Sequence, residues 1–366
     1  MKKVLLVGGM NPGGAEHQMV VLAILLKKEG YDVSYLCCDK SVFYQGDLEA
    51  SGVPIIRISE SKIASKLKLN IPRSAFLFYK IAKKGKFDTI ISFLAEWNFF
   101  NCITANLKKT KHRAITGIRN NRDEVFLWRR ERFYYKFEKY VYVKVSNSDA
   151  AKNKFAKYYP ELASKLKTIY NIVDLPPIVT SYTCKRDGKT NIIVPASYRE
   201  VKNPMRMLEA VSLMSVDDRK KLRIDWYGNI KAGKDLYDKM DYFIKMHQLS
   251  DVVFLYDATT DIANRINEAD MIGLFSTSEG LPNSICEGMM LSKPVLMTRV
   301  SDYDVLVDQT NGFLCDSDSA FSIKEALVLT TKLSEKELKN MGDNSKIKAI
   351  KLFSKEQVLK QWKLIV

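Results

Sequence analysis

The residues best suited to chemistry lie in the second half of the chain, in a loop and a helix that follow a predicted strand. Glu279 lies in the loop, and Glu287 lies more than a turn down the helix. Pro282 is typical of a first helical turn. The backbone N–H groups of Asn283 and Ser284 should therefore point into a ligand site, together with the positive end of the helix dipole. This pattern predicts one carboxylate among the reacting groups and a second that accepts hydrogen bonds from vicinal hydroxyls.

A second candidate is the glycine-rich loop between the first predicted strand and the first helix, which contains Gly13, Gly14 and Glu16. Glycines let backbone N–H groups approach an anion at a helix N-terminus. The loop is not a G-x-G-x-x-G dinucleotide fingerprint, and it is not a Walker loop, because no Gly-Lys-Ser/Thr follows. A plain strand-to-helix turn is the alternative interpretation.

The composition favours two globular domains with unequal charge. A chain of 366 residues, 46% apolar and 27% charged, has ample material for two hydrophobic cores. Residues 1–175 contain 31 basic and 16 acidic residues, whereas residues 176–366 contain 27 and 26. The net charge of +16 therefore belongs almost entirely to the first half.

Several classes of protein are disfavoured. No apolar run approaches the roughly 20 residues that span a bilayer, and the N-terminus has no signal-peptide pattern, so we expect a cytoplasmic protein. The six cysteines show no C-x-x-C spacing and are expected to be reduced thiols. With only His17, His112 and His247, a histidine-built metal site or nucleophilic triad has few candidates.

Both halves alternate short apolar runs with amphipathic stretches, which is typical of a parallel sheet covered by helices on both faces. The sequence thus predicts an α/β protein of two Rossmann-like, doubly wound domains, whose ligands bind at the carboxyl ends of the strands. The predicted strands lie at 4–7, 31–37, 53–58, 89–93, 113–118, 141–145, 191–196, 222–227, 252–256, 271–275 and 295–298.

Both periodicities are interrupted at 174–189, as expected of a connection between domains. We therefore place an N-terminal domain at 1–173 and a C-terminal domain at 174–350. The last helix, at 351–366, is expected to pack back on the N-terminal domain.

Taken as an ordered set, these motifs resemble those of the retaining glycosyltransferases of family 4, which have the GT-B architecture of two Rossmann-like domains across a cleft. Glu279 with Glu287 is similar to the paired-glutamate motif of that family. The resemblance covers most of the chain and is nearest to members that build bacterial surface polysaccharides. The other matching segments are the glycine loop Gly13–Glu16, the domain crossing Ile169–Asp174, the basic donor segment Lys202–Pro204 and the closing turn Asn311–Leu314.

The resemblance implies roles for the residues that match. Glu287 would bind the ribose of a nucleotide-sugar, UDP- or GDP-linked, and Glu279 would contact the sugar near its reacting carbon. Lys202 would neutralise the departing diphosphate. The remaining donor-binding candidates are Gly13, Gly14, Leu281, Pro282, Asn283 and Ser284.

Two positions depart from the family pattern. Many members carry an arginine five residues before the lysine, where this chain has Ser197, and we assign that role to Arg199. Many members also place a histidine after the fifth strand, where this chain has Arg119 and Asn120, as in the surface-glycan branch. These two residues and Glu16 are the candidates for contact with the acceptor. His17 is interpreted as a surface or capping residue.

The implied reaction is a metal-independent transfer of a sugar to a saccharide, with retention of configuration, in the assembly of a bacterial surface glycan such as lipopolysaccharide or capsule. No cofactor is expected, since two cations and a helix N-terminus stabilise the leaving group. The pairs Asp302/Asp304 and Asp316/Asp318 look like metal-binding Asp-x-Asp motifs but are interpreted as solvated loop residues.

The positive first half predicts an anionic partner. Basic residues are interleaved with aromatic residues at 62–86 and 126–137, and such surfaces bind anionic lipid. We therefore expect a lipid-linked saccharide acceptor and peripheral association with the inner face of the cell membrane. A core helix with solvated lysines is the alternative.

Three other functions fit part of the pattern. A sugar-nucleotide epimerase with GT-B architecture is the nearest alternative. A nucleic-acid-binding protein would explain the pI near 9.3, but no binding motif is recognisable and no nucleic-acid partner is expected. An NAD-dependent oxidoreductase would need a glycine fingerprint and an acidic residue ending the second strand, for which Asp39 is the nearest candidate.

Overall fold

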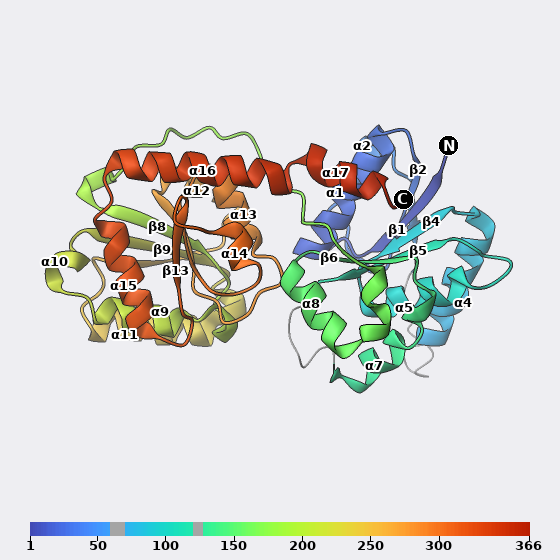
Figure 1. The fold of residues 1–366 in the computed structure, drawn as a ribbon, viewed down its shortest axis with the longest axis horizontal. Coiled ribbons are helices and arrows are strands. Elements are labelled where there is room, and N and C mark those ends of the chain that lie inside the picture. Colours follow the sequence, from blue (N-terminus) through green and yellow to red (C-terminus); the bar gives the residue numbers. More distant parts are fainter. Residues whose placement is uncertain (59–69, 120–126) are drawn as a thin grey trace. The chain divides into compact units, whose positions relative to one another are not determined.

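The computed structural model describes residues 1–58, 70–119 and 127–366, which form two compact units (Figure 1). Unit 1 comprises Met1–Ile172 and Lys355–Val366, and unit 2 comprises Val173–Ser354. The boundary expected between residues 350 and 351 falls inside helix α16 (Glu335–Phe353). The observed boundary follows Ser354, the residue that caps the end of that helix.

Unit 1 is built on a seven-stranded parallel sheet with strand order β3-β2-β1-β4-β5-β6-β7. Short edge strand β7 has no counterpart in the prediction, because its sequence Leu-Lys-Thr offers a single apolar side chain. The strands are β1 (Lys3–Gly8), β2 (Asp32–Cys37), β3 (Ile55–Arg57), β4 (Thr89–Ser92), β5 (Arg113–Ile118), β6 (Val143–Ser146) and β7 (Leu166–Thr168).

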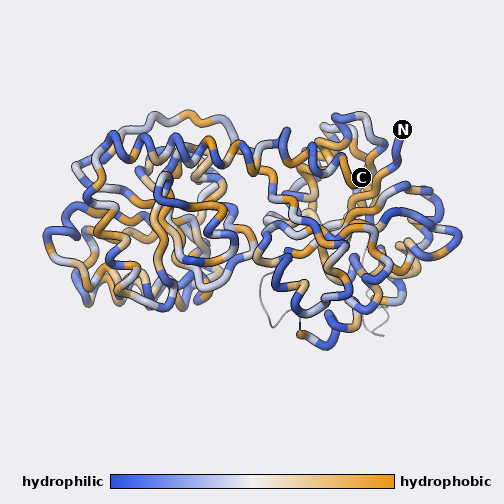
Figure 2. The backbone as a smooth tube through the Cα atoms, viewed as in Figure 1, coloured by the Kyte–Doolittle hydropathy of each residue, from blue (hydrophilic) through white to orange (hydrophobic). Residues whose placement is uncertain are grey.

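Helices cover both faces of this sheet (Figure 1). One face carries α1 (Gly14–Lys28), α2 (Gln45–Ala50) and α17 (Lys355–Lys363). The other carries α4 (Asn70–Gly85), α5 (Ala95–Ala105), α7 (Arg129–Tyr135) and α8 (Asp149–Tyr158). The apolar residues of β1, β2, β4, β5 and β6 are buried between these layers, and Figure 2 shows the concentration of apolar residues in the strands.

Unit 2 has a six-stranded parallel sheet with strand order β10-β9-β8-β11-β12-β13. Strand β13 corrects the prediction of a turn at 311–314. Gly312 allows this strand to lie against β12, because a Cβ atom there would meet the Val295 carbonyl oxygen at 2.2 Å. The strands are β8 (Thr190–Pro195), β9 (Leu222–Gly228), β10 (Val253–Asp257), β11 (Met271–Leu274), β12 (Val295–Thr298) and β13 (Gly312–Cys315).

The helices of unit 2 follow from the crossovers between these strands. Helices α9 (Pro204–Ser212), α11 (Lys234–Met246) and α15 (Ala320–Thr331) pack on one face, and α12 (Ile262–Glu268), α13 (Asn283–Met290) and α16 on the other (Figure 1).

All six cysteines are free, and four of them are buried. Within the described part of the chain, no helix is both long and apolar enough to cross a bilayer.

Candidate active site

The donor-site candidates of unit 2 gather at the carboxyl end of its sheet, in the loops after β8 and β11. The loops are joined by a 2.9 Å hydrogen bond from the Thr277 N–H to the Val201 carbonyl. The Lys202 ammonium lies 2.5 Å from Glu279 Oε1, and only 17% and 13% of the two side chains are exposed. Ser276 Oγ donates to the same carboxylate oxygen at 2.6 Å. The structure thus brings the predicted cation and carboxylate into direct contact.

The turn that positions Lys202 depends on Asn203, which has φ 58° and ψ 39°. Asparagine tolerates this left-handed conformation better than most residues. Its side-chain amide donates to the Ser317 carbonyl at 2.7 Å, and Pro204 then begins α9. Local backbone chemistry therefore holds the lysine at the end of the sheet.

Helix α13 begins one residue later than predicted, at Asn283. Pro282 is the N-cap residue with an extended ψ of 92°, and its carbonyl accepts the first intrahelical bond, from the Cys286 N–H at 3.2 Å. Leu281 and Pro282 are buried, whereas Asn283 and Ser284 are partly exposed. The N–H groups of the first turn are thus near the surface, beside the loop that carries Glu279.

Glu287 lies on α13 and is half-buried. Burial raises the pKa of its carboxyl from 4.5 to about 7. Among the residues that the structure describes, none forms a hydrogen bond or an ion pair with this carboxylate. A desolvated carboxyl of this kind gains most from a ligand that donates hydrogen bonds.

Arg199 is exposed, in contrast to Lys202. Its Nε donates to Ser197 Oγ at 2.8 Å, so the guanidinium folds back over Ser197, the position at which the resemblance implied an arginine. In the described part of the chain no ion pair joins Arg199 to Glu279.

In unit 1, the glycine loop follows β1 as predicted. Gly13 is the N-cap of α1, and Gly14 is its first residue. Glu16 folds against the loop, since a Cβ atom on Gly13 would meet its Oε2 at 2.3 Å. The absence of a side chain at Gly13 therefore permits the observed position of the Glu16 carboxylate.

The Asp39 carboxylate accepts hydrogen bonds from the glycine loop and is therefore not available to bind a ribose. It accepts these bonds from the Met10 N–H at 3.0 Å and from the Asn11 side-chain amide at 2.8 Å. The Ser41 N–H donates to its other oxygen at 3.0 Å. This geometry removes the one acidic candidate for a dinucleotide site after β2.

Arg119 follows β5, and its contacts within the described part of the chain are with neutral groups. Its guanidinium lies 3.6 Å from the centroid of the Phe93 ring, and its Nη1 donates to the Asn171 side-chain oxygen at 2.9 Å. Its Nε is buried and has no hydrogen-bond partner among the described residues. Burial lowers the pKa of Arg119 to about 9. Asn120, the neighbouring candidate, lies outside the described residues.

Phe93 and Asn171 are site residues to which sequence reasoning assigned no role, although the segments 91–94 and 169–174 that contain them carry part of the family resemblance. Phe93 follows β4 and lines a small hollow together with Gly9 and Glu16. Gly117 on the neighbouring strand makes room for the ring, because a Cβ atom there would lie 2.5 Å from Phe93 Cδ1. One feature of the sequence could have identified Phe93. An aromatic residue follows β4 directly, and the neighbouring strand β5 has a glycine, Gly117, near its end.

The Asp-x-Asp pairs need one correction. Asp302 is 2% exposed and is the N-cap residue of the short helix α14 (Tyr303–Leu306), without a capping hydrogen bond from its side chain, so it is not a solvated loop residue. Asp316 forms an ion pair with Arg299 at 2.7 Å. No cluster of three potential acidic, histidine or cysteine metal ligands occurs within the described ranges.

His17, interpreted as a surface or capping residue, stacks on Tyr44 with ring centroids 5.8 Å apart.

Two family profiles match the chain, one in each unit. The profile described as "Glycosyltransferase Family 4" matches residues 12–176, and the profile described as "Glycosyl transferases group 1" matches residues 183–348. The chain belongs to the family 4 glycosyltransferases. This match decides between a transferase and the epimerase that would share the architecture.

Individual relatives agree with this assignment. A Campylobacter jejuni α-1,4-N-acetylgalactosaminyltransferase, named for a diphospho-undecaprenol-linked saccharide, is 26% identical over 93% of this chain and 92% of its own length. The crystal structure of Anabaena HepE with UDP and glucose superposes with a TM-score of 0.81 at 15% identity, covering 100% and 99% of the two chains. A Rickettsia africae glycosyltransferase gives a TM-score of 0.79 at 17% identity, with 100% and 97% covered. The predicted GT-B fold is confirmed.

Proposed function

We propose that this glycosyltransferase transfers a sugar from a UDP- or GDP-sugar to a lipid-linked saccharide, with retention of configuration and without a metal ion. The observation that carries the proposal is the ion pair of Lys202 and Glu279 just before the first turn of α13. It combines a cation, a carboxylate and a helix N-terminus at the end of a parallel sheet, where such folds bind their ligands.

In this reaction the bond between the anomeric carbon and the diphosphate oxygen breaks, and the electron pair leaves with the diphosphate. The acceptor hydroxyl forms the new bond on the same face of the sugar, and its proton passes to the departing phosphate oxygen. Lys202 and Arg199 neutralise the developing negative charge, with the N–H groups of the α13 N-terminus. Since Glu279 and Ser276 hold Lys202 in place beforehand, little reorganisation is needed during transfer.

Glu287 supports the nucleotide part of this proposal. Its carboxylate has no partner among the described residues and a pKa raised by burial, so two ribose hydroxyls that donate to it would replace lost solvation. On the acceptor side, the partly exposed guanidinium of Arg119 offers a donor to an acceptor oxygen. Glu16 lines the same hollow as Phe93, on which Arg119 stacks.

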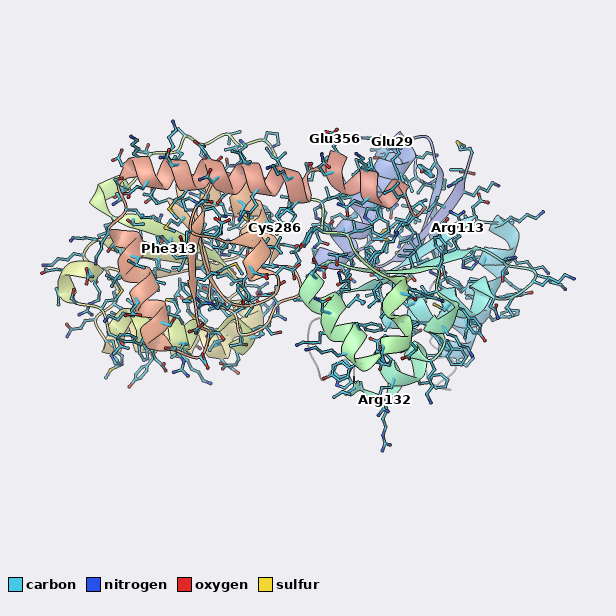
Figure 3. The ribbon with its side chains drawn as sticks, viewed as in Figure 1. Glu29, Arg113, Arg132, Cys286, Phe313 and Glu356 are labelled. Atoms are coloured by element: carbon cyan, nitrogen blue, oxygen red, sulfur yellow. The ribbon has the colours of Figure 1, made fainter. Side chains whose placement is uncertain are left out.

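The acceptor is proposed to be lipid-linked because unit 1 has an aromatic and basic surface. Helices α4 and α7 both pack against α5, and their outer sides expose large apolar residues, among them Trp128 at 54% and Phe76 at 56%. Arg132 projects away from the unit (Figure 3). Lys62, Lys66 and Lys68, which belong to the predicted basic cluster, lie outside the described residues. The Campylobacter relative, whose name includes an undecaprenol-linked saccharide, supports the same acceptor class.

A panel of UDP- and GDP-sugars tests the donor assignment. We expect one of them to raise the melting temperature of the protein, since a ligand that binds only the folded state stabilises it. The stabilising sugar should also be transferred at an unchanged rate in excess chelator, with the product retaining the anomeric configuration. Loss of transfer in chelator that only a divalent ion restores, or an inverted product, would contradict the proposal.

Sedimentation with vesicles tests the membrane surface. The full chain should sediment with phosphatidylglycerol vesicles at low salt and remain in the supernatant with phosphatidylcholine vesicles, because anionic lipid contributes about 1 kcal/mol for each basic residue near the surface. Trp128→Ala with Arg132→Glu should weaken the binding. The matched control, Tyr242→Ala with Lys245→Glu, removes an exposed aromatic and a basic residue of α11 in unit 2. Equal loss in both double variants would show that net charge alone is responsible.

A further inference from the structure

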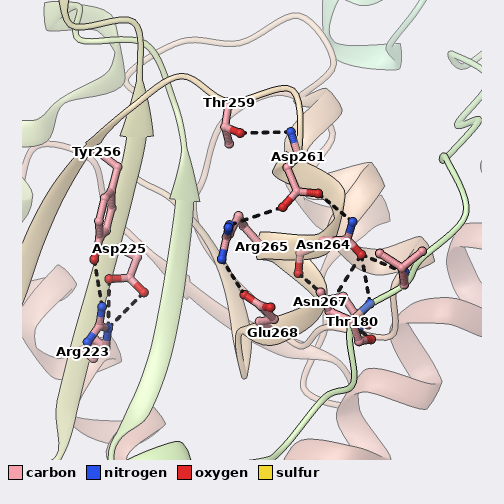
Figure 4. Close-up of polar contacts among 11 residues, drawn as sticks. Thr180, Arg223, Asp225, Tyr256, Thr259, Asp261, Asn264, Arg265, Asn267 and Glu268 are labelled. Carbon is pink, nitrogen blue, oxygen red and sulfur yellow. Dashed lines mark hydrogen bonds and ion pairs between the residues drawn. The ribbon is translucent and has the colours of Figure 1, made fainter.

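Unit 2 contains a polar pocket of about 630 Å³ that lies apart from the donor-site residues. It is lined from the sheet by Asn191 and by residues of β9 and β10, and from the opposite side by Arg265 and Glu268 of α12. Figure 4 shows these two α12 side chains facing Arg223, Asp225 and Tyr256 on the strands. A pocket of this size is typical of small-molecule sites.

The pocket exists because β9 has two different faces. Leu222, Ile224 and Trp226 are fully buried in the core with α9 and α11. The intervening Arg223, Asp225 and Tyr227 point to the opposite face, toward α12. A central strand of a parallel sheet is normally apolar on both faces. Helix α12 has only seven residues, and the polar face of β9 is left open beside it.

The polar side chains on the strands are ordered by mutual contacts. Arg223 Nε donates to both oxygens of Asp225 at 3.0 and 3.1 Å, and its Nη2 donates to the Tyr256 hydroxyl at 2.9 Å. Asp225 is only 7% exposed. The Asn191 side-chain oxygen is buried and has no hydrogen-bond partner among the described residues. The oxygen is enclosed by protein atoms, so Asn191 lines the pocket through its other atoms.

The lining favours a neutral ligand with many hydroxyl groups. Four carboxylates and two guanidinium groups are among the described lining residues, and this excess of negative charge repels diphosphates and other anions. Carboxylates accept hydrogen bonds while guanidinium groups donate them, and a hydroxyl can satisfy both. The rings of Tyr227 and Tyr256 stack with centroids 4.7 Å apart, which adds an apolar platform suited to the C–H face of a pyranose ring.

We infer that this pocket is a second saccharide-binding site, distinct from the donor site, that holds a neutral segment of the glycan on which the enzyme works. The inference rests on the proposed function for the identity of the ligand as a glycan. A remote site of this kind raises the effective concentration of a long acceptor at the enzyme.

The test uses the full chain with short neutral oligomers of glucose, galactose, N-acetylglucosamine and N-acetylgalactosamine. Saturation-transfer NMR and calorimetry should detect binding of at least one of these oligomers in the presence of saturating UDP. Arg265→Ala and Glu268→Ala should each weaken this binding about tenfold, because each removes a charged hydrogen-bonding group. Both residues are on the surface of α12, so the fold should tolerate the changes.

Arg206→Ala is the matched control, since Arg206 and Glu209 form an ion pair with the same i,i+3 spacing on α9, outside the pocket. Binding should be unaffected in this control and in Glu279→Gln. If oligosaccharides bind to a protein that shows no sugar transfer, the proposed function fails, while the assignment of the pocket as a saccharide-binding site stands. Absence of binding by every oligomer, competition by UDP-glucose, or equal binding by the α12 variants would overturn it.

Discussion

At the carboxyl end of the unit 2 sheet, the Lys202 ammonium contacts the Glu279 carboxylate at 2.5 Å. At the carboxyl end of the unit 1 sheet, the Arg119 guanidinium contacts an amide oxygen of Asn171 and the ring of Phe93. The first cation is compensated within the protein, and the second is desolvated without an ion pair to a carboxylate among the described residues. A partly buried cation without a counterion is destabilising until a ligand supplies one. Under the proposed function, this comparison predicts a donor site organised before binding and an acceptor site completed by its ligand.

Glu279→Ala should have the largest effect. It leaves Lys202 without its counterion and removes the carboxylate nearest to the reacting carbon in our proposal. We expect the turnover number to fall by about 10²- to 10³-fold, as for loss of a preorganised charged group, with a smaller change in donor affinity measured by thermal shift. Glu209→Ala, which removes an exposed carboxylate paired with Arg206 on α9, is the control. If the Glu279→Ala variant transferred sugar at the wild-type rate, the ion pair would have no part in the mechanism.

The pH dependence of donor binding should show the next largest effect. With a pKa of about 7, Glu287 is mostly protonated one unit below that value and mostly ionised one unit above. If the ionised form accepts the ribose hydroxyls, calorimetry should show affinity for UDP rising about tenfold across this interval. Glu287→Gln should abolish the dependence.

The same residue predicts a change in stability. Its folded pKa is raised above 4.5, so the folded state binds the proton more tightly than the unfolded chain and loses stability as the pH rises from about 4.5 to about 7. Glu287→Gln should therefore be most stabilising, relative to the wild type, above pH 7. A constant difference in melting temperature across this range would contradict the burial of this carboxyl.

Asn171→Asp tests the comparison most directly, because it gives Arg119 the carboxylate that Lys202 already has. The free protein should become more stable, by about 1 kcal/mol, while the KM for the acceptor rises severalfold because the new carboxylate competes with the ligand. Arg119→Gln should also raise this KM, without the gain in stability. Arg113→Ala, at the other end of β5, is the control and should change neither quantity. Tighter acceptor binding by Asn171→Asp would show that Arg119 does not bind an acceptor oxygen.

Much of the fold was predictable, because buried strands in parallel sheets are continuous apolar runs. The edge strands β7 and β13 were not, since segments of three or four residues are too short to establish a period. The burial of Asp302 could not be predicted either, because the residue lies in a turn-rich sequence, which favours exposure.

The candidate site was predictable where its residues belong to one local segment, as Glu279 and Glu287 do. The contact between Lys202 and Glu279 joins residues far apart in the sequence and depends on β8 and β11 being neighbours in the sheet. The partners of Arg119 follow from sheet order in the same way. The polar face of β9 is visible in the alternation of its sequence, but its significance requires knowing that α12 is too short to cover it.

The return of α17 to unit 1 has a consequence for synthesis of the protein. Val358, Trp362 and Ile365 are buried in the core that also contains β1 and α1, and the Trp362 ring lies 6.1 Å from that of Phe93. These residues are translated after the whole of unit 2. Unit 2 is contiguous in sequence and can fold as it leaves the ribosome. Unit 1 is synthesised first but cannot complete its core until α17 has been synthesised. A nascent chain is therefore expected to expose the core of unit 1 longest, and chaperones are expected to bind it there.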